Sequence, residues 1–558
     1  MLRTRHLVVL TLFASSLAAT QLAAATTPPR IVAYPATLPA HTPLRAVAPT
    51  TPVRLEFDLA PNNQSALSAL ALSVANPTSP NFHSYLASAT FSTRFGALPR
   101  GITELSQSLK AAGFHALNLG ADHLVLFATA TAAEASAYLH TSLFAAQVSH
   151  GTYIVNTTTA TIPANLAGVV LAVNGLNALP RAQSHAVAAP SSSQGSVASC
   201  ASAKNLAHAT SGPYTPWQLA KSYGFTYSAP ITPKRVALYE LSTYDPTSLR
   251  AYDSCFGLTP TVATRMVDGG TKDASGNLEV LLDTEIVASL APTSPIDIYT
   301  GPNTDAGWLD TLRAIATDNK DAVVSISWGS CESQVSPATL QAENAIFAEM
   351  AVQGQSVLVA SGDTGAQGCL PITGDFSTQA TDPASQPLVT AVGGTALVNT
   401  TCQYPSCEVV WNFNGNAGGG GASMYWPAPD YQSALGFSSR AFPDIAANAA
   451  PLSGYLVYDQ SDYFSQSGSG WGVVGGTSAA APLEAAMLAD TLASCPSRIG
   501  LWNETLYQVP TASFKDITVG SNDTTYVNYN LYAAKPGYDQ ASGLGVPLWN
   551  NPSTLVCP

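Results

Sequence analysis

A serine near the end of the chain lies in a sequence that suits nucleophilic chemistry. Ser478 belongs to Gly475-Gly476-Thr477-Ser478-Ala479-Ala480-Ala481-Pro482. The glycines permit a tight turn, and the small residues after it predict the start of a helix with Pro482 in its first turn. Amides at a helix N-terminus stabilise negative charge. Ser478 is therefore a candidate nucleophile, although this octapeptide alone is more often an ordinary helix cap.

A serine nucleophile needs a base, and histidine is the usual one. None of the nine histidines lies beyond His208, so the region around Ser478 has a histidine at most at its N-terminal edge. We therefore expect a carboxylate or a lysine as the base. The chain also lacks the Gly-x-Ser-x-Gly elbow of α/β-hydrolases.

Glu279 and Asp283 are a candidate carboxylate pair. They are four residues apart in a helix predicted over 278–290, which places them on one face with Cβ atoms about 5–6 Å apart. Two such carboxylates titrate as a coupled pair. Glu279 would accept the proton of Ser478, and Asp283 would orient Glu279. The alternative is a solvated helix face, on which acidic pairs are common.

Asp363 is a candidate oxyanion donor. It follows the apolar run 357–360, which predicts a strand of a parallel sheet. Ligands bind at the carboxyl ends of such strands. A protonated carboxyl group there can donate a hydrogen bond to a developing oxyanion. The alternative is a turn-forming aspartate that caps the next segment.

The elements that must position these residues alternate between strand and helix. Short β-rich runs at 235–239, 322–326 and 356–360 are interleaved with helical patterns at 278–290 and 338–352. This alternation predicts an α/β fold with a mostly parallel sheet and helices on both faces.

The region before it predicts a smaller α+β domain over about 50–180. Residues 53–59 alternate like a strand, 102–112 and 132–143 have helical patterns, and 125–127 predicts a short buried strand. Residues 181–203 are rich in Ser, Ala and Gly, which predicts a flexible, protease-accessible linker.

The N-terminus resembles a secretory signal peptide over residues 1–25. Arg3 and Arg5 precede an apolar stretch and the small residues Ala23-Ala24-Ala25. A membrane anchor is the alternative, but the apolar stretch is short. Eight cysteines behind such a segment predict disulfides, among them a local pair of Cys402 with Cys407. Secretion, to the extracellular space or the periplasm, is the expected localisation.

Charge limits the classes of partner. Only 10% of the 558 residues are charged and the formal net charge is −13, so we expect no nucleic-acid partner. The charge is also uneven: five Asp and Glu precede Cys200, and thirty follow it. A mildly basic N-terminal part would be attracted to an acidic remainder, and acid would weaken that attraction.

In combination, these motifs resemble the sedolisin family of serine-carboxyl peptidases, in particular its kumamolisin-like members. The resemblance rests on ordered segments over most of the chain: 76–86 and 91–96, 213–224, 279–283, 325–329, 360–363, 443–445 and 475–482. It implies a subtilisin-like peptidase domain over 204–558, preceded by an α+β, ferredoxin-like activation prodomain over 26–180 and a linker with the processing site over 181–203.

The resemblance also implies roles for single residues. Ser478 would be the nucleophile, Glu279 the general base, Asp283 its partner and Asp363 the oxyanion donor, while Glu240 and Trp328 would extend the network. One structural Ca²⁺ would bind near the C-terminus, where two carboxylates and backbone carbonyls make a hard oxygen site. Its ligands would be Asp516, Ile517, Lys535, Gly537 and Asp539.

The sequence thus predicts a secreted, acid-acting endopeptidase made as a zymogen. Protein or peptide substrates and its own inhibitory prodomain are the expected partners. We expect no membrane association after signal cleavage, and a monomer. The competing hypothesis is a catalytically silent secreted binding protein on a protease scaffold, and the four intact catalytic positions argue against it.

Overall fold

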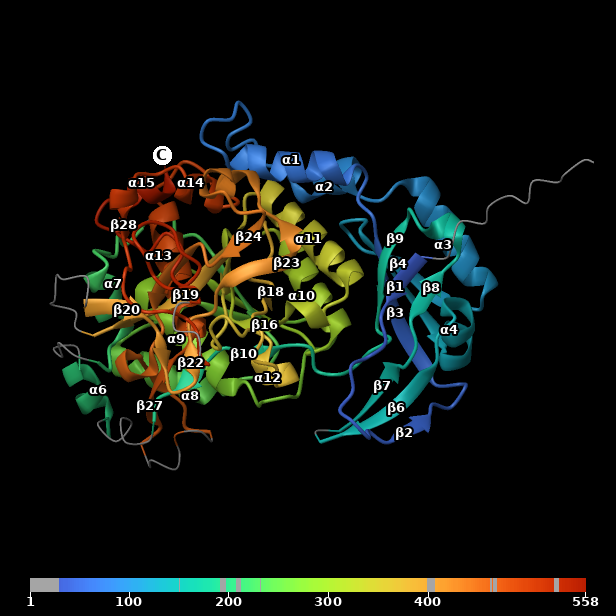
Figure 1. Cartoon of the computed structure of the whole chain (residues 1–558), viewed down its shortest axis with the longest axis horizontal. Helices are drawn as coiled ribbons and strands as arrows, with labels where there is room; N and C mark the ends of the chain where they lie inside the picture. Colours follow the sequence, from blue (N-terminus) through green and yellow to red (C-terminus); the bar gives the residue numbers. More distant parts are fainter. Residues whose placement is uncertain are drawn as a thin grey trace, which may run out of the picture.

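The computed structural model describes residues 30–149, 151–190, 197–206, 212–230, 232–398, 407–461, 464, 469–525 and 531–557. Figure 1 shows two parts side by side: a small α+β unit built from the blue and cyan segments, and a larger α/β unit built from the rest of the chain. The predicted signal peptide lies outside the described residues.

The large unit is built on an eight-stranded sheet. Its strand order is β13-β14-β12-β15-β17-β19-β20, and β25 also pairs with β19. All pairs are parallel except β19 with β20. The strands are β12 (Val236–Glu240), β13 (Val262–Met266), β14 (Ile296–Thr300), β15 (Val323–Ile326), β17 (Ser356–Ala360), β19 (Thr390–Leu397), β20 (Glu408–Val410) and β25 (Ile445–Asn448). The predicted mostly parallel sheet is confirmed.

Helices cover both faces of this sheet, as predicted. Alternate residues of β12 face two separate cores: Val236 and Leu238 pack with α9 (Asn277–Leu290) and α13 (Thr477–Leu492). Ala237 and Tyr239 pack with α10 (Asp305–Asp318) and α11 (Pro337–Val352). Both faces of the strands are therefore buried, which is why they read as continuous apolar runs.

The small unit is a four-stranded antiparallel sheet of order β4-β5-β3-β9. Its strands are β3 (Pro52–Leu59), β4 (His115–Leu119), β5 (Val125–Thr131) and β9 (Val170–Asn174), and α3 (Pro99–Ala111) and α4 (Ala132–Leu139) pack on one face. Strands and helices in this sequence and this strand order make a ferredoxin-like arrangement, as expected. The predicted helix 132–143 is shorter, because His140 takes a left-handed conformation and Leu143 begins β6 (Leu143–Val148).

The other face of the small sheet packs against the large unit. Alternation along β3 turns Leu55 and Phe57 into the small core, whereas Glu56 and Asp58 lie buried toward α10. Arg313 of α10 donates to Asp58 over 2.8 Å. Helix α1 (Gln64–Ala75) also lies along α11 (Figure 1). The polar face of β3 is thus an interface with the large unit.

The segment after the small unit differs from the predicted flexible linker in its first part. Strand β10 (Gln183–Ser184) pairs antiparallel with β16 (Trp328–Cys331). Strand β11 (Val187–Ala188) pairs antiparallel with β27 (Trp471–Gly475). Small side chains leave the backbone of this segment accessible to neighbouring strands. A sequence rich in Ser, Ala and Gly can therefore form a flexible linker or an extended strand that is held by its partners. Residues 191–196 lie outside the described residues.

Three disulfides join Cys200 to Cys255, Cys331 to Cys369 and Cys495 to Cys557. Cys407 is also disulfide-bonded, but Cys402 lies outside the described residues, so their pairing stays a prediction. Among the residues that the structure describes, no helix is both long and apolar enough to span a membrane.

Candidate active site

Ser478 lies at the buried start of α13, one residue after the helix begins. Gly476 precedes the helix with φ 101°, and a Cβ atom there would lie 1.9 Å from the carbonyl oxygen of His185, so glycine is required for the close approach. Pro482 lies in the second turn, not in the first turn as predicted. Proline cannot donate to the carbonyl of Ser478 four residues earlier. The Ser327 hydroxyl oxygen lies near that carbonyl, at 3.4 Å.

Glu279 lies in the first turn of α9 and is buried. The hydroxyl of Ser184 donates to Glu279 Oε2. Burial raises the pKa of Glu279 to about 7, and hydrogen bonds from Ser184 and Ser478 partly counter this rise. The structure therefore places Glu279 beside Ser478, whose hydroxyl donates to the Ser327 carbonyl oxygen over 3.3 Å in this state.

Asp283 lies one turn further along α9, fully buried behind Glu279. Its two oxygens accept from the Ser327 hydroxyl over 3.0 and 2.8 Å. Burial, followed by the charges of Glu240 and Glu279, raises its pKa well above the usual range. The sequence predicted contact between Asp283 and Glu279 but not Ser327, which links Asp283 to the backbone of Ser478.

Glu240 extends this acidic group at the end of β12. It accepts a 2.9 Å hydrogen bond from the indole N–H of Trp328. Burial, and next the charge of Glu279, raises its pKa well above the usual range. Glu240, Glu279 and Asp283 therefore share one region from which water is excluded. Fewer of these three carboxyl groups are ionised together there than would be ionised in water.

Asp363 follows β17 and faces the N-terminus of α13. One carboxyl oxygen, Oδ1, accepts from the Thr477 amide at 2.8 Å and from the Thr477 hydroxyl at 2.9 Å. The other, Oδ2, is buried with no partner among the described residues. Burial raises the pKa of Asp363 well above the usual range. A neutral carboxyl group with a free O–H is the form this environment favours.

A histidine that sequence reasoning did not place in the site lies between these groups. The Ser478 amide donates to the carbonyl oxygen of His185 at 3.4 Å, and the His185 amide donates to Ser327 at 3.2 Å. Burial lowers the pKa of the His185 imidazole to about 4. Only its backbone meets Ser478, so it is not a triad base. A motif search could not find it because its partners are over 140 residues away.

The segment around His185 crosses the site as a peptide substrate would. It pairs with a strand on each side, and its carbonyl points at the Ser478 amide. Asp363 Oδ2 lies beside that carbonyl, since both are close to Gly476. The peptide bond after His185 is therefore the one presented to Ser478. This geometry suits acyl transfer, with donors directed at a carbonyl oxygen.

The proposed calcium ligands come from two segments, 516–517 and 535–539, and a hydrogen bond between Asp516 and Gly537 joins them. Asp516 accepts from the Gly537 amide at 2.9 Å, and Asp539 accepts from the Lys535 amide at 3.0 Å. Burial raises the pKa of Asp539, and Ile517 is fully buried. Two carboxylates held against backbone amides of these segments, with backbone carbonyls of the same residues, would offer the oxygen ligands that Ca²⁺ prefers.

A second acidic group was not predicted from sequence. Among the described residues, the carboxylates of Glu56, Asp268 and Asp310 lie within 4.8 Å of one another, close enough to hold a metal ion. Arg54 already pairs with all three. The group joins β3 to the large unit, and the polar alternation of β3 was its only signal in the sequence.

The fold and site together define a subtilisin-like peptidase. Residues 263–538 match the model of the subtilase family. Residues 40–179 match the model "Pro-kumamolisin, activation domain".

Related proteins identify the family within the subtilisin-like peptidases. The chain is 36% identical to kumamolisin of a Bacillus species over 412 residues, which cover 69% of this chain and 70% of that protein. It is 28% identical to sedolisin of a Pseudomonas species over 90% of this chain and 87% of that protein. A solved structure of Pseudomonas sedolisin with pseudo-iodotyrostatin aligns with a TM-score of 0.53 and 26% identity, covering 62% of this chain and 98% of that one. The protein belongs to the sedolisin–kumamolisin family and is a serine-carboxyl peptidase with an activation prodomain.

Proposed function

We propose that the protein is a secreted, acid-acting endopeptidase made as a zymogen, with Ser478 as nucleophile. The observation that carries this proposal is the His185 carbonyl, which lies against the Ser478 amide and beside Asp363 while Glu279 is within reach of the Ser478 hydroxyl. Nucleophile, base and oxyanion donors therefore surround one peptide bond.

The reaction would proceed in two halves. Ser478 Oγ attacks the carbonyl carbon while its proton moves to Glu279, and the oxyanion accepts from the Ser478 amide and from the Asp363 carboxyl. Glu279 then gives its proton to the leaving amine as the carbon–nitrogen bond breaks. A water molecule, deprotonated by Glu279, hydrolyses the acyl-enzyme and restores the Ser478 hydroxyl. Asp283 and Glu240 are positioning residues for Glu279.

Acid operation follows from the two functional carboxyls. Asp363 donates only when protonated, and its raised pKa keeps it protonated well above the ordinary carboxyl range. Glu279 must instead be able to accept a proton. Its pKa of about 7 in the zymogen arises mainly from burial, while hydrogen bonds from Ser184, His185 and Ala186 of the docked segment lower it. When that segment leaves, water reaches the site and reduces the burial, and with ordinary carboxyl pKa values near 4 we expect activity at roughly pH 3–5.

The prodomain would act as an inhibitor whose own C-terminal segment occupies the site. The first self-cleavage would fall between His185 and Ala186, because that bond faces Ser478. Secretion through residues 1–25, a processing region within 181–203 and a mature domain over 204–558 complete this proposal. One Ca²⁺ held by Asp516, Asp539 and the carbonyls of Ile517, Lys535 and Gly537 would rigidify the C-terminal loop.

A casein assay across pH 3–7 tests the proposal against a silent binding protein. Full-length protein is held at acidic pH and then assayed beside the Ser478→Ala variant. We expect wild-type cleavage with an acidic optimum, and no cleavage by the variant. Absence of wild-type activity at every pH, or an optimum at neutral or alkaline pH, would overturn the proposal.

A further inference from the structure

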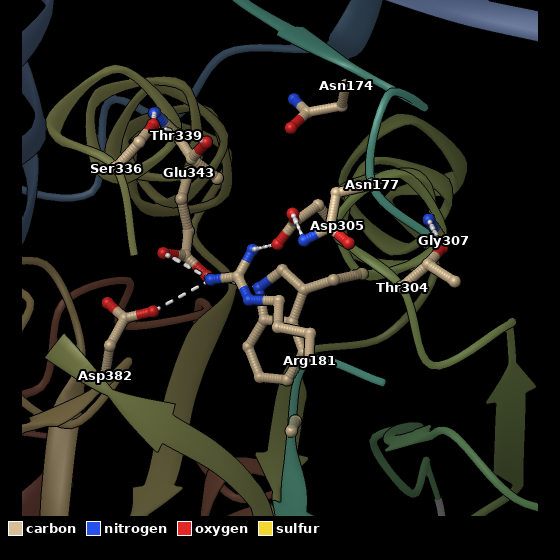
Figure 2. A network of polar contacts seen from close by, with 12 residues as sticks. Asn174, Asn177, Arg181, Thr304, Asp305, Gly307, Ser336, Thr339, Glu343 and Asp382 are labelled. Atoms are coloured by element: carbon tan, nitrogen blue, oxygen red, sulfur yellow. Dashed lines mark hydrogen bonds and ion pairs between the residues drawn. The ribbon is translucent and has the colours of Figure 1, made fainter. Parts of the chain in front are cut away.

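The segment that crosses the active site begins with a buried arginine. Arg181 lies four residues before His185, so it is the fifth residue before the bond that faces Ser478. Its side chain is only 3% exposed and enters a pocket of the peptidase domain. Figure 2 shows the guanidinium among acidic side chains from three different elements. Once the prodomain has left, this pocket is open to a side chain of the substrate.

The pocket recognises the guanidinium by charge. Arg181 Nη2 donates to Glu343 of α11 at 3.2 Å and to Asp382 of β18 (Thr381–Asp382) at 2.9 Å (Figure 2). Nη1 lies 4.0 Å from Asp305 at the start of α10. Burial, and next the charge of Glu343, raises the pKa of Asp382 well above its usual range, and the charge of Arg181 counters this rise. Ionisation of the pocket is therefore coupled to the presence of a cation. Burial of a charge is tolerated only where such partners compensate it.

An aromatic ring completes the recognition of a planar cation. The guanidinium carbon of Arg181 lies 4.5 Å from the centre of the Trp308 ring, in cation–π geometry. A planar guanidinium stacks on this ring while its N–H groups point at the carboxylates in its own plane, whereas an ammonium group has no plane to stack. The pocket therefore favours arginine over lysine.

Glu343 and Asp382 are held by the peptidase domain itself, whereas Asp305 accepts from Asn177 of the prodomain at 3.5 Å. Gln386 donates to Glu343 at 3.1 Å and to Asp382 at 3.3 Å, and the indole N–H of Trp308 also donates to Glu343. None of these partners belongs to the prodomain. The pocket is therefore preorganised and stays in place after Arg181 leaves.

The backbone beside the pocket is held without regard to sequence. The side-chain oxygen of Asn303 accepts from the amides of Arg181 and Ala182 at 3.0 and 2.9 Å, and its nitrogen donates to the Ala182 carbonyl at 2.8 Å. An amide side chain that bonds both the N–H and the C=O groups of a peptide backbone can hold any extended chain, whatever its side chains. It would place the fifth residue of any substrate at the mouth of the acidic pocket.

We infer that the mature enzyme has a specificity subsite for arginine at the fifth position before the scissile bond, built by Asp305, Trp308, Glu343 and Asp382, with Asn303 as its backbone clamp. This inference rests on the proposed function and adds a substrate preference to it. In the zymogen, Arg181 occupies this subsite and mimics the preferred substrate side chain.

Two peptides test the subsite. Their sequence is Xaa-Ala-Gln-Ser-His-Ala-Val-Ala, with Xaa either arginine or its neutral isostere citrulline, and full-length protein activated in acid is the enzyme. We expect kcat/KM to be at least about tenfold higher for the arginine peptide, because a buried charged hydrogen bond is lost with citrulline. Cleavage should follow histidine in both peptides.

Variants distinguish the pocket from a general effect of charge. Glu343→Gln should bring the arginine-to-citrulline ratio of kcat/KM close to one. Asp318→Asn, on the helix α10 that carries Asp305 and Trp308, is the control, since Asp318 pairs with Arg265 and Lys320 instead. Should Glu343→Gln fail to fold, Asp305→Asn provides the test, because Asp305 is 29% exposed. It should lower the ratio by a smaller factor.

The outcomes separate the two proposals. Equal kcat/KM for the two peptides overturns the subsite, while casein cleavage shows that the proposed function stands. Casein cleavage with neither peptide cut, or with cuts at another bond, overturns the register on which the subsite rests. Failure to cut casein as well as both peptides overturns the proposed function.

Discussion

Replacing Asp363 separates the two properties that the proposed oxyanion site needs, a hydrogen-bond donor and a retained proton. Asp363→Ala removes the donor. Loss of one such donor usually lowers kcat by about 10²–10³, equivalent to about 3–4 kcal/mol. Thr477 loses its acceptor in the same variant, so the unfolding temperature is measured beside kcat.

Asp363→Asn keeps a donor that needs no proton. The Thr477 amide and hydroxyl both donate to Oδ1, which fixes the amide oxygen of an asparagine at that position and turns its NH₂ toward the place of Oδ2. This NH₂ would face the substrate carbonyl at every pH. The wild-type donor, in contrast, is present below the raised pKa of Asp363 and is lost above it.

The assay is kcat against pH for wild type, Asp363→Asn and Asp363→Ala, with active enzyme counted by titration. We expect Asp363→Asn to retain activity in acid and to decline at higher pH than wild type. Two results together would refute the reasoning: Asp363→Ala with undiminished kcat, and an unchanged decline for Asp363→Asn.

Three further predictions concern calcium, cysteines and the inhibitory segment. Chelation of Ca²⁺ should lower Tm by at least about 2 °C, and Asp516→Asn should remove this response; purified protein without calcium and with a Tm unaffected by chelator would contradict the site. Free-thiol titration of denatured, unreduced protein should find none, and six or more thiols would contradict the expected disulfides. His185 has a pKa of about 4 in the site, so its neutral form docks, and docking weakens as pH falls from the ordinary histidine value toward 4. Because the first cleavage needs the docked segment, His185→Gln, which stays docked, should process itself faster than wild type at pH 5 in timed gels, and an unchanged rate would exclude this effect.

Interface carboxylates act in the opposite direction from His185. Burial raises the pKa of Asp58 and of Asp268 to about 6. Below that pH the docked state takes up protons more readily than a free carboxyl group does, so mild acid does not by itself separate β3 from α10. The charge asymmetry of the sequence suggested release by carboxylate neutralisation. The structure instead favours cleavage at the site as the step that frees the prodomain.

Two apolar helices with clear ends could be predicted almost to the residue. The helix expected at 278–290 is Asn277–Leu290, and the helix expected at 338–352 is Pro337–Val352. Their apolar residues are buried on nearly every side, and each begins at a clear turn. The helix expected at 132–143 failed at its end, because the apolar run continues across His140 into a strand that helical periodicity does not separate.

The motifs predicted the catalytic residues around Ser478, but they did not predict the segment around His185 that covers them. Glu279 and Asp363 were within reach of sequence reasoning because each follows a recognisable helix or strand signal. His185 and Arg181 were not, since their segment has no periodicity of its own and is held by β16, β27 and Asn303 from the distant peptidase domain. Tertiary pairing, rather than local sequence, determines that segment's conformation.

The most direct test of the central claim is timed mass spectrometry after a jump from neutral to acidic pH. Wild type and Ser478→Ala are purified as full-length chains and sampled as processing begins. We predict that the first wild-type fragments end at His185 and begin at Ala186, and that Ser478→Ala stays intact. Processing of Ser478→Ala at the wild-type rate, or a wild-type chain that becomes fully active while covalently intact, would contradict the claim.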